Sequence, residues 1–223
     1  MKKLNSRFLP TFHAVLILLC FVFPPFPSLA EEDLRFHALE VKGMVTAYHD
    51  ENDETARLYL NQTLDDGDKA TTGPDSEVVL RLKDKAYVYL APHTKIHITK
   101  LRMEDKGFRC QINLITGRML CQLEQVPPWS LEVSAGSVMC HEHGTLFEIT
   151  RKEEELGIVS YQGSVVADFH GQSKIAKTNE VVKLDHGKFR FRNHHLKRDE
   201  QAHLQAWQDL LSKMIGNTPT PAP

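Results

Sequence analysis

The stretch GDKATTGPDSEVVLRLKDKAYVYLAPHTKIHITKL, residues 67–101, decides the fold of this chain. In its VVLRLK segment, Leu80 and Leu82 alternate with charged residues, and Val88 and Leu90 alternate with tyrosines in AYVYLA. KIHITK repeats the pattern. Alternation with a period of two, bounded by Gly, Pro and Asp, is typical of half-buried β-strands. The stretch therefore predicts several short strands joined by tight turns.

Working outward, strand signals recur about every 8 to 12 residues up to residue 192, the spacing of a sandwich or barrel-like sheet protein. The sequence does not alternate strand and helix patterns, so we do not expect the crossover helices that connect parallel strands. Residues 31–192 are thus expected to form an all-β domain, a twisted two-layer structure that is sandwich- or roll-like.

The period then changes near the C-terminus. Leu204, Trp207 and Leu211 are spaced by threes and fours, which predicts one amphipathic helix within residues 193–216. We expect this helix to pack on one end or edge of the sheets, where it would block association between strands. The proline-rich residues 217–223 are expected to be disordered.

The first thirty residues have the order of a secretory signal. A basic start is followed by the apolar run AVLILLCFVF and by small residues at Ser28 and Ala30. The run is too short for a membrane span, which needs about 20 residues. We expect export to the periplasm, cleavage after Ala30 and no membrane span in the mature chain.

Charge and cysteine content narrow the function further. The net charge of −2 argues against a nucleic-acid binder.

Cleavage of the signal removes Cys20 and leaves Cys110, Cys121 and Cys140 in an oxidising compartment. If Gly117 marks a hairpin turn, Cys110 and Cys121 are diagonal neighbours near the upper distance limit for a disulfide. A disulfide between them and a pair of buried thiols are both open.

Several short motifs, in this order and spacing, resemble the FecR family, the periplasmic domain of iron-dicitrate-type surface signalling regulators. The segments that carry the resemblance are the opening stretch, INLITGRMLCQL (112–123), HGTLFEI (143–149) and YQGSVVA (161–167). The resemblance implies structural roles for a set of motif residues: Gly67, Asp68, Gly73, Ser76, Thr94, Gly117, Gly144, Thr145, Phe147 and Gly163. It also implies that residues 112–123 form a strand–Gly–strand hairpin.

The resemblance implies a function without catalysis. A stand-alone secreted form would act through contact with an envelope or outer-membrane protein, in envelope signalling or assembly, and would need no cofactor. The chain has no G-x-S-x-G, P-loop or dinucleotide fingerprint, in agreement with this expectation. The alternative, from a different class, is a ligand-binding module for cell-wall glycan or a metal ion.

The segment CHEHGT, residues 140–145, carries the metal hypothesis. Residues two apart on a strand point the same way, with Cα atoms about 6.6 Å apart, so His141 and His143 could bind one metal ion. A structural zinc ion usually has four protein ligands, and only these two are local. A polar strand face that ends at a glycine turn needs no metal ion, and it is the favoured interpretation of the segment.

Overall fold

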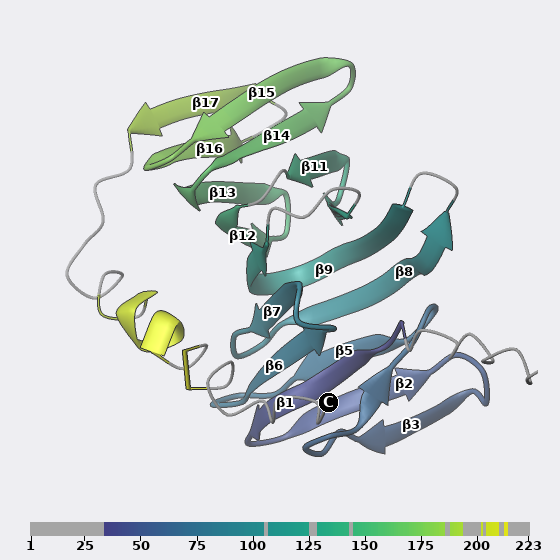
Figure 1. The fold of residues 1–223 in the computed structure, drawn as a ribbon. Coiled ribbons are helices and arrows are strands. Elements are labelled where there is room, and N and C mark those ends of the chain that lie inside the picture. Colours follow the sequence, from purple (N-terminus) through teal and green to yellow (C-terminus); the bar gives the residue numbers. More distant parts are fainter. Residues whose placement is uncertain are drawn as a thin grey trace, which may run out of the picture. The chain divides into compact units, whose positions relative to one another are not determined.

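The computed structural model describes residues 34–104, 107–124, 129–142, 145–185, 188–193, 202, 204–209 and 212–213. Strands dominate this part of the chain (Figure 1). They are β1 (Phe36–Lys42), β2 (Val45–His49), β3 (Glu54–Arg57), β4 (Thr63–Leu64), β5 (Lys69–Thr72), β6 (Glu77–Leu82), β7 (Ala86–Leu90), β8 (Lys95–Glu104), β9 (Gly107–Leu123), β10 (Ser130–Ala135), β11 (Val138–Glu142), β12 (Leu146–Lys152), β13 (Glu155–Gln162), β14 (Ser164–Phe169), β15 (Gln172–Lys177), β16 (Glu180–Asp185) and β17 (Lys188–Asn193). The helical residues near the C-terminus, 202, 204–209 and 212–213, are called the C-terminal helix. The prediction of an all-β fold with one such helix is confirmed.

The strands pair into two sheets. Sheet A has the order β4–β1–β6–β7–β9–β12–β13–β16–β17. Sheet B has the order β3–β2–β5–β8–β9–β10–β11–β14–β15. Of the described pairs, only β9 with β10 is parallel.

Strand β9 belongs to both sheets. Its first part pairs with β8 and β10 in sheet B, and its last part, from Gly117 onward, pairs with β7 and β12 in sheet A. Figure 1 shows β9 as one long arrow beside β8. The expected hairpin over residues 112–123 is therefore wrong. Gly117 has φ +100°, and it marks the place where a continuous strand changes sheets rather than a turn.

The main core lies between the sheets and contains side chains from both. Leu80 and Val88 of sheet A and Ile96 and Ile112 of sheet B are all fully buried in it. This core explains the alternation of apolar and polar residues in the opening stretch. The apolar side chains of each strand point inward and pack against those of the other sheet.

A second apolar cluster covers the opposite face of sheet A. Tyr87 and Tyr89 of β7 contribute to it, together with Leu120, Leu146 and Trp207. The ring centroids of Tyr89 and Trp207 are 5.6 Å apart. The C-terminal helix therefore packs on the face of sheet A and not, as expected, on an end or edge. Tyr87 and Tyr89 are therefore covered by the apolar side of this helix, which includes Trp207.

The cysteine geometry corrects the disulfide hypothesis. Cys110 pairs with Leu101 in sheet B, whereas Cys121 pairs with Val88 in sheet A. Eleven steps of one strand, at about 3.3 Å each, separate the two residues. Cys110, Cys121 and Cys140 are all buried thiols.

No helix in the described part of the chain has the length and apolar character that a transmembrane span requires.

Candidate functional site

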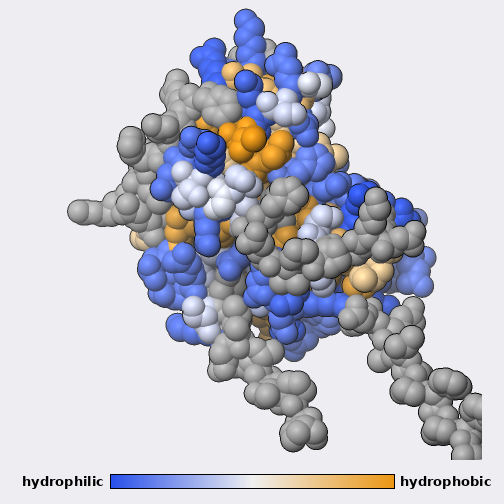
Figure 2. Space-filling model, turned by 45° about the horizontal axis from the view of Figure 1, so that its top comes forward, coloured by the Kyte–Doolittle hydropathy of each residue, from blue (hydrophilic) through white to orange (hydrophobic). Residues whose placement is uncertain are grey.

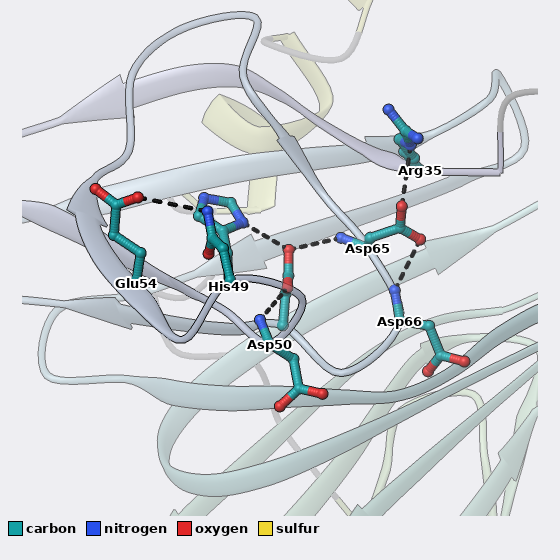
Figure 3. A network of polar contacts seen from close by, with 8 residues as sticks. Arg35, His49, Asp50, Glu54, Asp65 and Asp66 are labelled. Atoms are coloured by element: carbon teal, nitrogen blue, oxygen red, sulfur yellow. Dashed lines mark hydrogen bonds and ion pairs between the residues drawn. The ribbon is translucent and has the colours of Figure 1, made fainter.

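A polar network lies at the end of β2, and His49, Asp50 and Asp65 belong to it (Figure 3). Asp68, at the start of the opening stretch, is the centre of this network. One carboxylate oxygen accepts the backbone N–H of Asp50 at 3.0 Å. The other accepts the backbone N–H of Asp65 at 2.9 Å and lies 2.9 Å from Nδ1 of His49. The side chain of Asp68 is only 5% exposed. A buried carboxylate must be hydrogen-bonded to be tolerated, and backbone groups supply most of that here.

The turn beside Asp68 depends on Gly67. Its φ of +88° favours glycine, and a Cβ atom there would lie 2.8 Å from Cβ of Asp50. On the solvent side, Arg35 forms an ion pair with Asp65 at 3.0 Å. A cavity of about 370 Å³ opens here, with four acidic residues and Arg35 among its lining residues. The Gly-Asp motif thus fixes the β4–β5 turn against the end of β2.

Thr94 and Thr72 form a second node, beside Gly117. The hydroxyl of Thr72 donates to the carbonyl of Ala91 at 2.6 Å and accepts the N–H of Thr94 at 2.8 Å. The hydroxyl of Thr94 lies 3.1 Å from the carbonyl of Arg118 and accepts the N–H of that residue at 3.0 Å. A Cβ atom on Gly117 would lie 2.4 Å from Cα of Thr94. The close approach lets one threonine hold β9 at its crossing point.

Ser76 forms a third node. Its hydroxyl donates to the carbonyl of Pro74 at 2.8 Å and accepts the N–H of Met44 at 2.8 Å. A Cβ atom on Gly73 would lie 3.2 Å from the carbonyl oxygen of Met44, which also accepts the Gly73 N–H. These contacts tie the β5–β6 turn to the β1–β2 turn.

The remaining motif residues lie near β12 and β13. The carbonyl of Thr145 accepts the N–H of Leu123, and Phe147 is fully buried opposite Cys121. Gly163 has φ +77°, and its carbonyl accepts the hydroxyls of Ser160 and Thr178. Gly144 lies outside the described residues. The polar groups of the described motif residues are engaged in holding turns and strands, which leaves them poorly placed to act on a ligand.

His141 of β11 lies on the outer face of sheet B, between two carboxylates. Its Nε2 is 3.3 Å from Asp168 and its Nδ1 is 3.7 Å from Glu132. Arg109 is 4.0 Å from the same Glu132, and Gln111 donates to it. His143 lies outside the described residues. Within the residues that are described, no three His, Cys, Asp or Glu side chains converge on a metal position.

Cys110 and Cys140 do not offer a reactive thiol. Cys140 is 1% exposed, and burial raises the pKa of its thiol to about 12. Burial raises the pKa of the Cys110 thiol as well. Since the thiolate is the nucleophile, both residues are inert at neutral pH.

Apolar surface is limited among the described residues. Figure 2 shows a face on which hydrophilic side chains predominate and hydrophobic ones gather in a small area. The large exposed hydrophobic residues are Met44, Tyr59, Leu60, Met103 and Ile175. Tyr59 and Leu60 border a cavity of about 450 Å³ beside β1. The alternation analysis missed this site because both residues lie in a connection between strands.

Residues 68–166 match the model of the family described as FecR protein. This segment is therefore similar to a FecR domain. It runs from β5 into β14, and the strands on either side of the match, β1–β4 and β15–β17, complete the same two sheets. The resemblance seen in the sequence motifs is thereby confirmed.

Two solved structures have a similar fold. Both are crystal structures of a candidate anti-sigma factor from Parabacteroides distasonis ATCC 8503, at 1.65 and 2.50 Å resolution. Each is 13% identical to this chain, with TM-scores of 0.52 and 0.51. The alignments cover 63% of this chain and 64% and 63% of those chains, less than two thirds of their length. No curated protein matches the chain. At this identity the likeness establishes the fold alone.

Proposed function

We propose that this FecR-type protein is a non-catalytic regulator that works in the periplasm by contact with another envelope protein, in signalling or assembly. The FecR match of residues 68–166 carries the proposal. The family is associated with the envelope, and the structural neighbours described as anti-sigma factors agree with a regulatory role. The partner would be an envelope or outer-membrane protein.

The chemistry of the described residues supports a role without catalysis. Backbone N–H groups of neighbouring turns and strands donate hydrogen bonds to the side chains of Asp68, Thr94 and Ser76. The buried thiols of Cys110 and Cys140 are protonated at neutral pH. A nucleophile or general base needs an atom that the substrate can reach, and the side chains of Asp68, Cys110 and Cys140 are buried.

Export is the first part of the proposal to test. The N-terminus predicts cleavage after Ala30, so the mature protein begins at Glu31. Intact-mass measurement on protein recovered from the native periplasm should give the mass of residues 31–223. A mature N-terminus at Met1, or a lipid on Cys20, would refute this assignment.

Partner capture tests the function itself. The tagged protein is crosslinked in living cells, and retained proteins are compared with those held by an unrelated exported protein with the same tag. A specific envelope protein should be retained, and it should bind the purified protein in a titration. If no protein binds but the purified chain alone retains cell-wall glycan or stoichiometric metal, the ligand-binding alternative replaces our proposal.

A further inference from the structure

The edge of β1 is open along half of its length. On one side β1 pairs with β6 from Phe36 to Lys42. On the other side it pairs with β4 only at Phe36 and His37, and the connection at residues 61–62 hydrogen-bonds to Ala38. Within the described part of the chain, no strand pairs with this outer edge at residues 39–42. Unpaired backbone groups at a sheet edge are a template for another strand.

The open segment, Leu39-Glu40-Val41-Lys42, carries an ordered pair of opposite charges. Glu40 lies opposite Val79 and Lys42 opposite Glu77, so both charged side chains stand on the same outer face of sheet A. Both are exposed. Lys42 already donates to Glu77 across the strand pair at 3.1 Å. The side chain of Lys42 is nevertheless 65% exposed, which leaves it able to meet a second carboxylate.

We propose that a second copy of this chain pairs with this edge, β1 antiparallel to β1, about a two-fold axis at Val41. This register places Glu40 of each copy directly opposite Lys42 of the other. Two identical ion pairs then form across the axis, each an extension of the Lys42–Glu77 contact. The segment is complementary to itself, as a two-fold interface requires. Opposite charges that face each other on neighbouring strands stabilise their pairing, and like charges oppose it.

The cavity beside the edge supplies apolar surface for the same contact. It lies between β1 and residues 57–60, and Tyr59 and Leu60 border it with exposed fractions of 55% and 57%. Arg57 donates to the carbonyl of Gly43, and its guanidinium lies 5.4 Å from the centre of the Tyr59 ring. This contact holds the tyrosine at the border of the cavity. Pairing of two copies would remove both apolar side chains from water, whereas a single copy leaves them exposed.

Charge reversal tests the register. Sedimentation velocity on the purified protein should show a dimer whose population rises with concentration. Glu40→Lys places two lysines opposite each other, and it should weaken dimerisation by about tenfold or more. Lys42→Glu should do the same. The double variant Glu40→Lys with Lys42→Glu restores opposite charges and should bring the dissociation constant back to within about threefold of the original.

Two controls separate pairing from folding and from net charge. Both charged residues are exposed, so the variants should unfold at temperatures close to that of the unmodified protein. Glu154→Lys, in the exposed β12–β13 turn, changes the net charge as Glu40→Lys does and should leave dimerisation unchanged. A monomer at all concentrations would overturn the proposal, and so would a double variant as weak as the single ones. The proposal does not depend on the regulatory function, so failure of one leaves the other standing.

Discussion

At the scale of single residues, the FecR motif is a set of polar hubs that hold turns. Asp68 shows the principle most directly, because its two oxygens hold the backbone N–H groups of Asp50 and Asp65 and face the ring of His49. This position requires a small, buried side chain with two oxygen atoms that can accept hydrogen bonds. Asp68 therefore uses its hydrogen-bonding capacity within the fold, to stabilise this turn.

Replacing Asp68 by Asn should lower the free energy of unfolding by about 1 to 3 kcal/mol, since the amide nitrogen cannot accept a hydrogen bond and leaves a buried donor unsatisfied. Urea unfolding measures the effect. The matched control is Asp66→Asn, two residues earlier and exposed, which should change stability by less than about 0.5 kcal/mol. Equal effects of the two variants would show that Asp68 does not act as a hub.

Cys140 makes a prediction about alkaline pH. Burial raises the pKa of its thiol from 9.0 to about 12. Below pH 9 both the folded and the unfolded chain keep this proton, so the thiol has no effect on the pH dependence of stability. Between pH 9 and about 12 only the unfolded chain releases it, so the thiol should lower the free energy of unfolding by up to about 1.4 kcal/mol per pH unit.

Urea unfolding of the original protein and of Cys140→Ala, at pH 8, 9 and 10, isolates this contribution. Other titrating groups are common to both proteins and cancel in the comparison. The variant should lose less stability between pH 9 and 10 than the original protein does. Identical slopes would mean that the thiol is not protected from solvent.

At the scale of elements, β9 is the strand that joins the two sheets, and Gly117 is the residue that allows it. Gly117→Ala should lower the free energy of unfolding by about 3 kcal/mol or more, because the added Cβ meets the backbone of Thr94 and φ is positive. Gly157→Ala is the matched control. That glycine lies in β13 with open space where the Cβ would stand, so its replacement should be tolerated. Equal stability of the two variants would contradict the crossing geometry.

The alternation pattern predicted individual strands well and their connections less well. Period two determines which side chains of a strand face the same way, so Val88 and Tyr89 could be assigned to opposite faces. Gly117 could not be distinguished from a turn glycine, because a positive φ serves both a hairpin and a strand that changes sheets. Pairing between distant strands, such as β1 with β6, depends on the whole sandwich and has no local signal.

The C-terminal helix illustrates the same limit. Its apolar spacing predicted a buried stripe, and Trp207 is indeed 4% exposed. An apolar stripe does not specify which surface the helix will cover. The helix was expected at an edge of the sheets, but it covers the face of sheet A that carries the tyrosines of β7. Trp207 also keeps an indole N–H that is buried with no hydrogen-bond partner among the described residues.

Trp207→Ala should cost about 3 kcal/mol, or the whole docking free energy of the helix if that is smaller. Trp207→Phe should cost less, because it keeps an aromatic ring beside Tyr89 and removes the unsatisfied donor. Gln208→Ala, next to it on the exposed side, is the control. Thermal unfolding followed by circular dichroism decides the order, and an alanine variant as stable as the control would show an undocked helix.

At the scale of the molecule, one core and one shared strand join the two sheets. Side chains of both layers meet in the same core, and β9 contributes hydrogen bonds to four neighbouring strands. The two sheets should therefore unfold together. The C-terminal helix contacts only the outer cluster of sheet A among the described residues, and a short helix is marginal without its docking surface.

Hydrogen exchange of the native protein should reveal this hierarchy. Amides in the middle of β9 should exchange only through global unfolding, whereas those of helical residues 204–209 should exchange through local undocking, about a hundredfold faster or more. Low concentrations of urea should accelerate exchange in β9 and leave the helix nearly unchanged, because undocking exposes much less surface than global unfolding. If helix and β9 instead exchange at the same rate and respond equally to urea, the helix is an integral part of the cooperative fold and cannot move independently of the sheets.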